Sequence, residues 1–314
     1  MRPPPAEVSV IIPTAGRPEL LAQALASVRA IEGPDIAIDA IVVDDGNDPM
    51  TAEIVRRHGA RLHRAPAHGA GAARNEGLRA ATGDFIAFLD DDDVWLPGHV
   101  RPHVQLMHER AETGAVMGQV ISYDHTLREH SQPWPNPLPT SPTSFGRVFS
   151  YQPQIGATVV RASVVQRVGL FDETLVSDED WDWQLRLALA TTVDFVAVAC
   201  VAYRSRPEGL RQADELNWSR LPDFGRVFWR NVRRGGRARP SWPSILRGYL
   251  RVRGQFASGF INSAVVHSRS GDISYARRQL LRGLRASPVH SCLRLMREST
   301  ARRAVLRLMA GASR

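Results

Sequence analysis

The stretch that decides the fold reads Gly83-Asp84-Phe85-Ile86-Ala87-Phe88-Leu89-Asp90-Asp91-Asp92-Asp93. Its apolar run, Phe85 to Leu89, has the length of a strand, and a run bounded by glycine and charge is typical of a buried parallel strand. Ligands of open α/β sheets bind at the carboxyl ends of the strands. Four adjacent carboxylates repel one another unless a cation or donors neutralise them, and hard oxygens suit Mg²⁺ or Mn²⁺. The stretch therefore predicts either a metal-assisted site at a sheet edge or a solvated acidic turn.

A second acidic strand end lies earlier in the chain. Ile38 to Val43 predicts a strand that ends in Asp44-Asp45, and Val8 to Ile12 predicts a strand that Pro13 terminates. Apolar residues at helical spacing, as in Leu20 to Val28, predict helices between the strands. Alternating strands and helices with short joins predict right-handed βαβ units and a mostly parallel sheet. Both acidic ends are then expected on one rim of that sheet.

The later part of the chain is less regular. Pro97 to Glu112 and Glu179 to Ala190 predict helices, and Val193 to Tyr203 predicts a last strand. Between them, Gln132 to Tyr151 contains five prolines and predicts a long loop, of the kind that often serves as a lid or binding loop. From about Glu208 onward the chain is expected to be helical.

Composition is that of a soluble globular protein, with 314 residues, 43% hydrophobic and 23% charged. No apolar run approaches the roughly 18 residues of a membrane span, and Met1 to Pro5 is no apolar signal region. The cysteines, Cys200 and Cys292, match neither a disulfide framework nor a zinc pattern, and Cys200 is expected in the core. We therefore expect a cytoplasmic protein, with a peripheral position at the inner face of the membrane as an option.

Charge is distributed unevenly along the chain. Residues 1–202 contain 16 Arg and 26 acidic residues, whereas residues 203–314 contain 24 Arg and 6 acidic residues, and lysine is absent. A basic C-terminal third favours anionic partners such as phosphates, acidic lipid surfaces or nucleic acid. Its amphipathic stretches, 245–260 and 275–285, are compatible with a membrane surface, with packing on the rest of the chain, or with a homodimer.

Six short motifs, each weak alone, occur in an order and spacing that resemble the family 2 glycosyltransferases, which have the GT-A fold. The resemblance covers about residues 7–206. It implies a hexosyltransferase-type enzyme that takes a sugar from a nucleotide diphosphate donor, with Mg²⁺ or Mn²⁺ and with inversion. The matching residues are Val8 to Thr14, Val42 to Gly46, Ala73 to Gly77, Phe88 to Asp93, Phe171 to Glu173, and Glu179-Asp180.

Carried over onto this sequence, the resemblance implies a donor site at the sheet rim. Asp92 would be the metal ligand of a DxD motif, although the run Asp90 to Asp93 also allows a register shifted by one residue. Asp45 would accept a hydrogen bond from the base, which is uracil if the donor is a UDP-sugar. The residues expected to contact the nucleotide-sugar are Pro13, Thr14, Ala15, Arg17, Asp45, Arg74, Asp90, Asp91, Arg204 and Arg206.

The same resemblance assigns the general base to Asp180. One carboxylate within hydrogen-bond reach of the acceptor hydroxyl suffices for that role. Glu179 and Trp181 are the candidate acceptor contacts. Without the resemblance, Glu179-Asp180 would be an ordinary acidic pair at a helix N-terminus. Trp181 and Trp183 are equally compatible with stacking on a sugar and with packing in the core.

Two other patterns carry less weight. Gly69-x-Gly71 lacks the third glycine of a dinucleotide fingerprint and does not follow the first strand, so NAD binding is excluded. His99 and His103 have a spacing that could bind metal, but Pro102 interrupts them and no third ligand is evident. We therefore expect them to be exposed.

The sequence predicts a GT-A domain over residues 1–206, with a nucleotide-sugar half at about 7–98 and an acceptor half at about 99–206. A basic helical region, 207–314, follows it. Rival hypotheses are a sugar-nucleotide-binding protein without transferase activity, a protein that binds nucleic acid or membranes through its Arg-rich tail, and a nucleotidyltransferase. The acceptor classes compatible with the sequence are a glycan, a lipid-linked molecule and a natural product.

Overall fold

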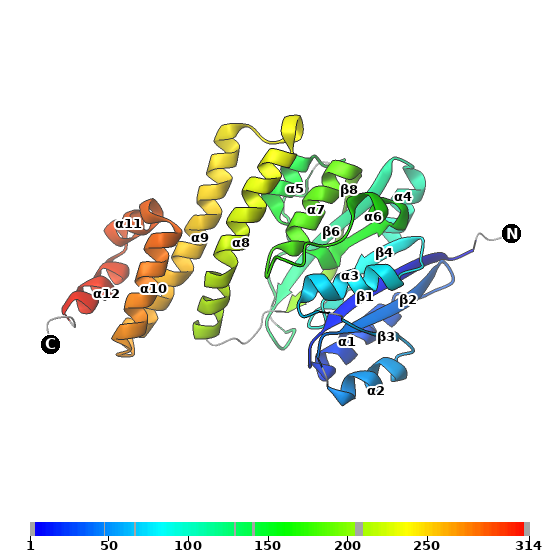
Figure 1. Cartoon of the computed structure of the whole chain (residues 1–314), viewed down its shortest axis with the longest axis horizontal. Coiled ribbons are helices and arrows are strands. Elements are labelled where there is room, and N and C mark those ends of the chain that lie inside the picture. Colours follow the sequence, from blue (N-terminus) through cyan, green and yellow to red (C-terminus); the bar gives the residue numbers. More distant parts are fainter. Residues whose placement is uncertain are drawn as a thin grey trace. The chain divides into compact units, whose positions relative to one another are not determined.

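The computed structural model describes residues 4–46, 48–65, 67–128, 130–139, 142–204 and 210–310. The chain divides into two compact units (Figure 1). The first runs to residue 206 and takes in Gly235–Ala238, and the second comprises residues 207–234 and 239–314.

The first unit is built on a mixed sheet, which has eight strands within the described residues, in the order β3-β2-β1-β4-β7-β6-β8-β5. The strands are β1 (Ala6–Thr14), β2 (Ile36–Asp44), β3 (Arg61–Arg64), β4 (Phe85–Phe88), β5 (Val94–Trp95), β6 (Thr113–Tyr123), β7 (Thr158–Arg161) and β8 (Thr192–Arg204).

Strands β3, β2, β1 and β4 are all parallel, as the alternation of strands and helices predicts. Their connections run through α1 (Pro18–Arg29), α2 (Pro49–Arg57) and α3 (Ala70–Ala80). Helices α1 and α2 each begin with proline, whose fixed φ and missing N–H suit the first helical turn. This half of the sheet therefore presents its carboxyl ends on one rim.

The other half of the sheet is mixed. Strand β7 is antiparallel to both β4 and β6, β5 is antiparallel to β8, and β6 runs parallel to β8 with irregular register. The Pro-rich segment predicted as a loop ends in a short helix, α5 (Phe145–Tyr151), which precedes the turn η1 (Ile155–Ala157). The remaining helices of this half are α4 (Arg101–Glu109), α6 (Ala162–Val168) and α7 (Glu179–Ala190).

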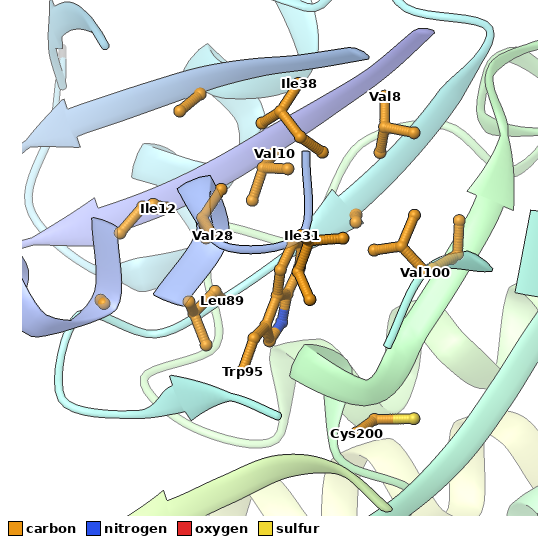
Figure 2. Packing of buried hydrophobic residues seen from close by; sticks show 14 of the residues in the cluster. Val8, Val10, Ile12, Val28, Ile31, Ile38, Leu89, Trp95, Val100 and Cys200 are labelled. Atoms are coloured by element: carbon orange, nitrogen blue, oxygen red, sulfur yellow. The ribbon is translucent and has the colours of Figure 1, made fainter. Parts of the chain in front are cut away.

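Alternation along β1 divides the core between the two faces of the sheet. Val8, Val10 and Ile12 pack on the face covered by α1, where Val28 meets them (Figure 2). Ile11 belongs to the cluster on the opposite face. Each fully buried Val, Leu or Ile contributes about 1.5–3 kcal/mol relative to an exposed position.

The opposite face holds an aromatic cluster that decides the role of Trp183. Its indole is fully buried, stacks on Phe171 with ring centroids 5.0 Å apart, and meets the edge of Phe88 at 5.6 Å. The indole N–H donates to the Gly169 carbonyl at 2.8 Å. Trp183 is therefore a core residue, which is one of the two roles compatible with its sequence position.

The expectation of exposed histidines at 99 and 103 is wrong, because both side chains are 0% exposed. Helix α4 begins at Arg101, later than predicted, since residues 97–100 form a tight turn. The Leu96 N–H donates to the Cys200 carbonyl at 2.8 Å and holds this turn against β8. Cys200 is buried beside the two rings, where the sequence places it in the core.

The second unit is helical, as the sequence predicts. Its helices are α8 (Leu210–Arg234), α9 (Trp242–Arg269), α10 (Ile273–Ala286), α11 (Pro288–Arg297) and α12 (Ser299–Ala310) (Figure 1). The buried Asp214 carboxylate accepts hydrogen bonds from Tyr275 and Ser263, and so joins α8 to α9 and α10. Across all described residues, none of the helices combines the length and the apolar character that crossing a bilayer requires.

Candidate active site

Thr14, the last residue of β1, joins the two acidic strand ends. Its carbonyl accepts a hydrogen bond from the Asp45 N–H at 2.9 Å, and its hydroxyl donates to the Asp91 carboxylate at 2.6 Å. Asp45 follows β2, and Asp91 follows β4. The two acidic clusters therefore lie on one rim of the sheet, at the carboxyl ends of its parallel strands.

Arg17 provides the nearest positive charge to the four aspartates. It lies in the turn between β1 and α1, donates to Asp92 at 2.8 Å, and forms an ion pair with Asp91. A third of its side chain is exposed, whereas the Asp91 carboxylate is completely buried. In this structure Arg17 pairs with two acids of the run, and its expected contact with the nucleotide-sugar stays a prediction.

The four aspartates differ in exposure. Asp91 is fully buried, and Asp92 and Asp93 are 6% and 5% exposed, whereas the side chain of Asp90 is 33% exposed. Burial raises the pKa of Asp91 to about 6, opposed by the charge of Arg17 and the hydroxyl of Thr14. Asp91 thus acts as an internal anchor of the loop, and Asp90 is the carboxylate that solvent reaches most easily.

Arg204, at the end of β8, holds the same acidic loop from the other side. Its backbone N–H donates to the Asp93 carboxylate, and its side-chain Nε donates to the Asp92 carbonyl, both at 2.8 Å. The remaining guanidinium nitrogens donate to the His125 carbonyl at 2.9 Å and to the Gln23 side chain at 2.8 Å. The Arg204 guanidinium thus braces the loop, and its expected contact with the diphosphate stays a prediction. Arg206 lies outside the described residues.

Arg74, on α3, connects the acidic loop to the N-terminus of α7. Its guanidinium donates to Asp90 at 2.7 Å and to Glu179 at 2.6 Å. The arginine side chain is only 4% exposed, so the two ion pairs are strong by the standards of surface pairs. Burial opposes the charge of Arg74, yet Asp90, Glu179 and Asp180 together raise its pKa.

Asn75 fixes a second connection next to Arg74. Its amide donates to the Phe171 carbonyl at 3.0 Å and to Glu173 at 2.7 Å, and its oxygen accepts from the Phe171 N–H at 2.7 Å. The motif at Phe171 to Glu173 is therefore tied to α3. This pairing of two motifs is a contact that the sequence does not predict.

Asp180 lies in the first turn of α7 and is partly exposed. One carboxylate oxygen accepts from the Trp181 N–H at 2.7 Å. Burial, and next the charge of Glu179, raise the pKa of Asp180 to about 6, against the opposing charge of Arg74. Such a carboxyl group is mostly ionised at neutral pH and holds its proton more tightly than an ordinary aspartate.

At the other end of the rim, Asp44 and Asp45 have different partners. Asp44 is 1% exposed and pairs with Arg64, so it is structural. Asp45 is partly exposed, accepts from the Gly69 N–H at 2.8 Å and contacts His68. Gly69 precedes α3 at φ +110°, a conformation that favours glycine.

The other candidate residues have distinct environments. Pro13 is buried in β1 opposite Val43, and Ala15 is exposed in the following turn. Trp181 is 3% exposed and lies 5.6 Å from the ring of Phe149, which favours packing over contact with a sugar. Glu179, the other candidate acceptor contact, is occupied by its ion pair with Arg74.

The comparison with solved structures identifies the fold. Residues 1–349 of Staphylococcus aureus TarS match 89% of this chain and cover 89% of the solved chain, with a TM-score of 0.54 and 17% identity. A Pyrobaculum calidifontis mannosyltransferase, solved with GDP-Man and Mn²⁺, matches 93% of this chain and 87% of its own, with a TM-score of 0.56 and 17% identity. These neighbours show a GT-A fold.

Curated relatives are glycosyltransferases. The pre-mycofactocin glycosyltransferase of Mycobacterium tuberculosis is 32% identical over 216 residues, 64% of this chain, and the chain spans only 43% of that protein. A glycosyltransferase of Bacillus subtilis, YwdF, is 27% identical over 236 residues, which cover 70% of this chain and 82% of the relative. The sequence profile described as glycosyl transferase family 2 matches residues 9–171. The chain therefore belongs to glycosyl transferase family 2.

Proposed function

We propose that this member of glycosyl transferase family 2 is a metal-dependent, inverting glycosyltransferase, and that it moves a sugar from a nucleotide diphosphate, most simply UDP, to an acceptor hydroxyl. One observation carries the proposal. Arg74 bonds Asp90 of the acidic run at 2.7 Å and Glu179, the neighbour of Asp180, at 2.6 Å. The donor-binding acids and the proposed base thereby border one site.

In this proposal the nucleotide lies along the sheet rim. Asp45 accepts a hydrogen bond from the base, and Pro13, Thr14 and Ala15 line the base pocket. Asp90 and Asp91 lie beside the ribose. The positive charges for the diphosphate come from Arg17, Arg74, Arg204 and Arg206. The partial exposure of Asp45 and Asp90 supports this placement, because both carboxylates can meet a ligand.

The donor set of the acidic run fits a hard divalent cation. Asp92 would hold it; a register shifted by one residue would instead use Asp91 or Asp93, which already bond Thr14 and Arg204. Mg²⁺ is commonly held by one or two carboxylates together with substrate phosphates. When bound, Mg²⁺ or Mn²⁺ would act as a Lewis acid toward the leaving diphosphate.

Asp180 serves as the general base. Its carboxylate accepts the proton of the acceptor hydroxyl while that oxygen attacks the anomeric carbon, and the bond between the sugar and the diphosphate breaks on the opposite face. The anomeric centre is therefore inverted. A pKa of about 6 suits this role, because the base is ionised at neutral pH and still basic enough to take a proton.

The comparisons support a class of donor rather than one particular donor. Structures of TarS include a complex with UDP-GlcNAc, and the Pyrobaculum enzyme was solved with GDP-Man and Mn²⁺. We extend this class, a nucleotide diphosphate sugar with a divalent cation, to the present chain. The choice of UDP rests on the family resemblance alone, under which Asp45 accepts a hydrogen bond from the base.

The proposal is tested with Asp180→Asn, which keeps the shape of the side chain and removes its basicity. Sugar transfer should fall by about 10²–10⁴-fold, the usual contribution of a general base, while nucleotide affinity stays within a few-fold. Glu112→Gln is the matched control, since that exposed acid is far along the chain from every motif. Equal loss of transfer and of nucleotide binding in the Asp180 variant would refute the assignment. Full nucleotide binding with no transfer in the wild type would instead favour a binding protein.

We propose that residues 1–206 are catalytic and that residues 207–314 bind the acceptor or an anionic membrane surface. Val289, Leu293 and Met296, on one side of α11, are 70%, 44% and 71% exposed, and Arg297 follows them. Leu293→Glu should weaken binding to vesicles that contain anionic lipid. Equal binding of wild type and variant would leave the acceptor or a homodimer as the role of the tail.

A further inference from the structure

His99, His103 and Cys200 form a cluster that the proposed reaction does not use. All three side chains are 0% exposed. His99 follows β5, His103 lies on α4, and Cys200 lies on β8, at the edge of the core near Trp95 (Figure 2). Each contributes one ligating atom, and these atoms all lie within 4.8 Å of one another.

The distances match those around a single metal ion. The Sγ atom of Cys200 lies 3.7 Å from Nε2 of His103. Zinc bonds of about 2.3 Å to sulfur and about 2.1 Å to nitrogen, at a tetrahedral angle, place those two ligand atoms about 3.6 Å apart. The ring centroids of His99 and His103 are 4.7 Å apart, so the third ligand lies beside the other two.

The surroundings of the two rings also suit ligands. Metal-bound histidines usually donate their other ring N–H to a carbonyl or carboxylate. The Gly156 carbonyl interacts with the ring of His99, and the Ala157 carbonyl interacts with the ring of His103. Among the described residues, no partner completes a hydrogen bond of normal geometry with either ring nitrogen of His99. A buried polar group without a hydrogen bond destabilises the folded state, and a bound ligand would offset that loss of stability.

A glycine leaves the space that this cluster occupies. Gly118 lies on β6, the strand next to β8. A Cβ atom at this position would overlap Sγ of Cys200 and would lie 3.3 Å from Nε2 of His103. The backbone of β6 therefore approaches the thiol and the imidazole closely enough to close the site on that side.

We propose that His99, His103 and Cys200 bind one structural d¹⁰ ion, zinc or copper(I), at a site separate from the donor site. Thiolate and imidazole ligands select these ions, whereas the aspartates of the rim suit Mg²⁺ or Mn²⁺. On binding, the Cys200 thiol loses its proton to solvent and the sulfur donates an electron pair to the ion. The ion connects the turn at 97–100 to β8. It thereby stabilises the acidic run Asp90 to Asp93, which precedes this turn, and Arg204, which ends β8.

The first experiment is elemental analysis of the full-length protein after growth with added zinc and copper and passage over a chelator that removes exchangeable ions. Wild type should retain one zinc or one copper per chain, and the element found distinguishes the two. Cys200→Ala should lose it, whereas Cys292→Ala, which removes the exposed cysteine, should keep it. The result is independent of whether the enzyme transfers sugar.

A second measurement covers the case in which Cys200→Ala does not fold. Wild type refolded with Co²⁺ should give a thiolate-to-cobalt charge-transfer band in the near ultraviolet, and His103→Gln should weaken it strongly. The melting temperature of wild type should fall when the ion is stripped. Wild type that carries no transition metal and gives no cobalt band would overturn the proposal, and the cluster would then be neutral core packing.

Discussion

Replacing Arg74 by alanine tests how the site is held together. Its guanidinium is 4% exposed and bonds Glu179, whose side chain is 11% exposed, and Asp90, which is 33% exposed. Removing one partner of a buried ion pair costs about 3–5 kcal/mol, because the other charge stays buried without compensation. Since Asp90 retains access to water, we expect the lower end, about 3 kcal/mol. For a domain of this size that corresponds to a fall in melting temperature of about 6–12 °C.

The same substitution should change the pH dependence of transfer. Arg74 lowers the pKa of Asp180, so its removal raises that pKa above its present value of about 6. The base is active when ionised, and the acid limb of the kcat/KM profile should therefore move to higher pH. Thermal unfolding and pH–rate profiles measure the two effects. Arg79→Ala, on the same helix but 48% exposed, is the control and should change neither. An Arg74→Ala enzyme with an unchanged melting temperature and acid limb would refute this reasoning.

Four further outcomes follow from the same geometry. In the wild type, kcat/KM should fall about tenfold per pH unit below about pH 6 as Asp180 takes up its proton, and a profile that stays flat well below that pH would exclude it as the base. Arg17→Ala should remove the positive charge beside Asp91 and Asp92, weaken nucleotide binding and lower the divalent cation concentration needed for activity; unchanged titrations would mean that Arg17 serves the loop alone. Asn75→Ala should release the turn at Phe171 and lower the melting temperature, to be compared by calorimetry with wild type. Trp183→Ala should cost about 3–5 kcal/mol in urea unfolding, and a cost below about 1 kcal/mol would contradict its place in the core.

The half of the fold up to β4 could be predicted from the sequence because it depends on local patterns. Each apolar run is a strand, and the spacing between Leu20 and Val28 gives a helix with one buried face. The acidic ends share a rim because parallel strands must end on the same side. The motifs at Asp90 to Asp93 and at Glu179-Asp180 then indicate the family, which the profile match confirms.

The parts that could not be predicted depend on contacts between segments distant in the sequence. No local pattern indicates that Arg74 would bond Glu179, or that Arg204 would brace the acidic loop. The burial of His99 depends on a tight turn held by β8, whereas helical periodicity favours an exposed position. Strand β7 is antiparallel to its neighbours because the chain returns to the sheet through a long Pro-rich segment. Hydrophobic periodicity and strand propensity do not predict the direction of a strand that follows such a segment.

The most direct test of the central claim is calorimetric titration of the protein with UDP, GDP and dTDP, each in the presence of Mn²⁺ and of a chelator. The account predicts that one nucleotide binds clearly more tightly than the others, that this affinity is lost with chelator, and that Asp92→Ala loses the dependence on metal. Metal-independent binding in the wild type would contradict the role given to the acidic run. Failure of every nucleotide to bind would contradict the donor site as a whole.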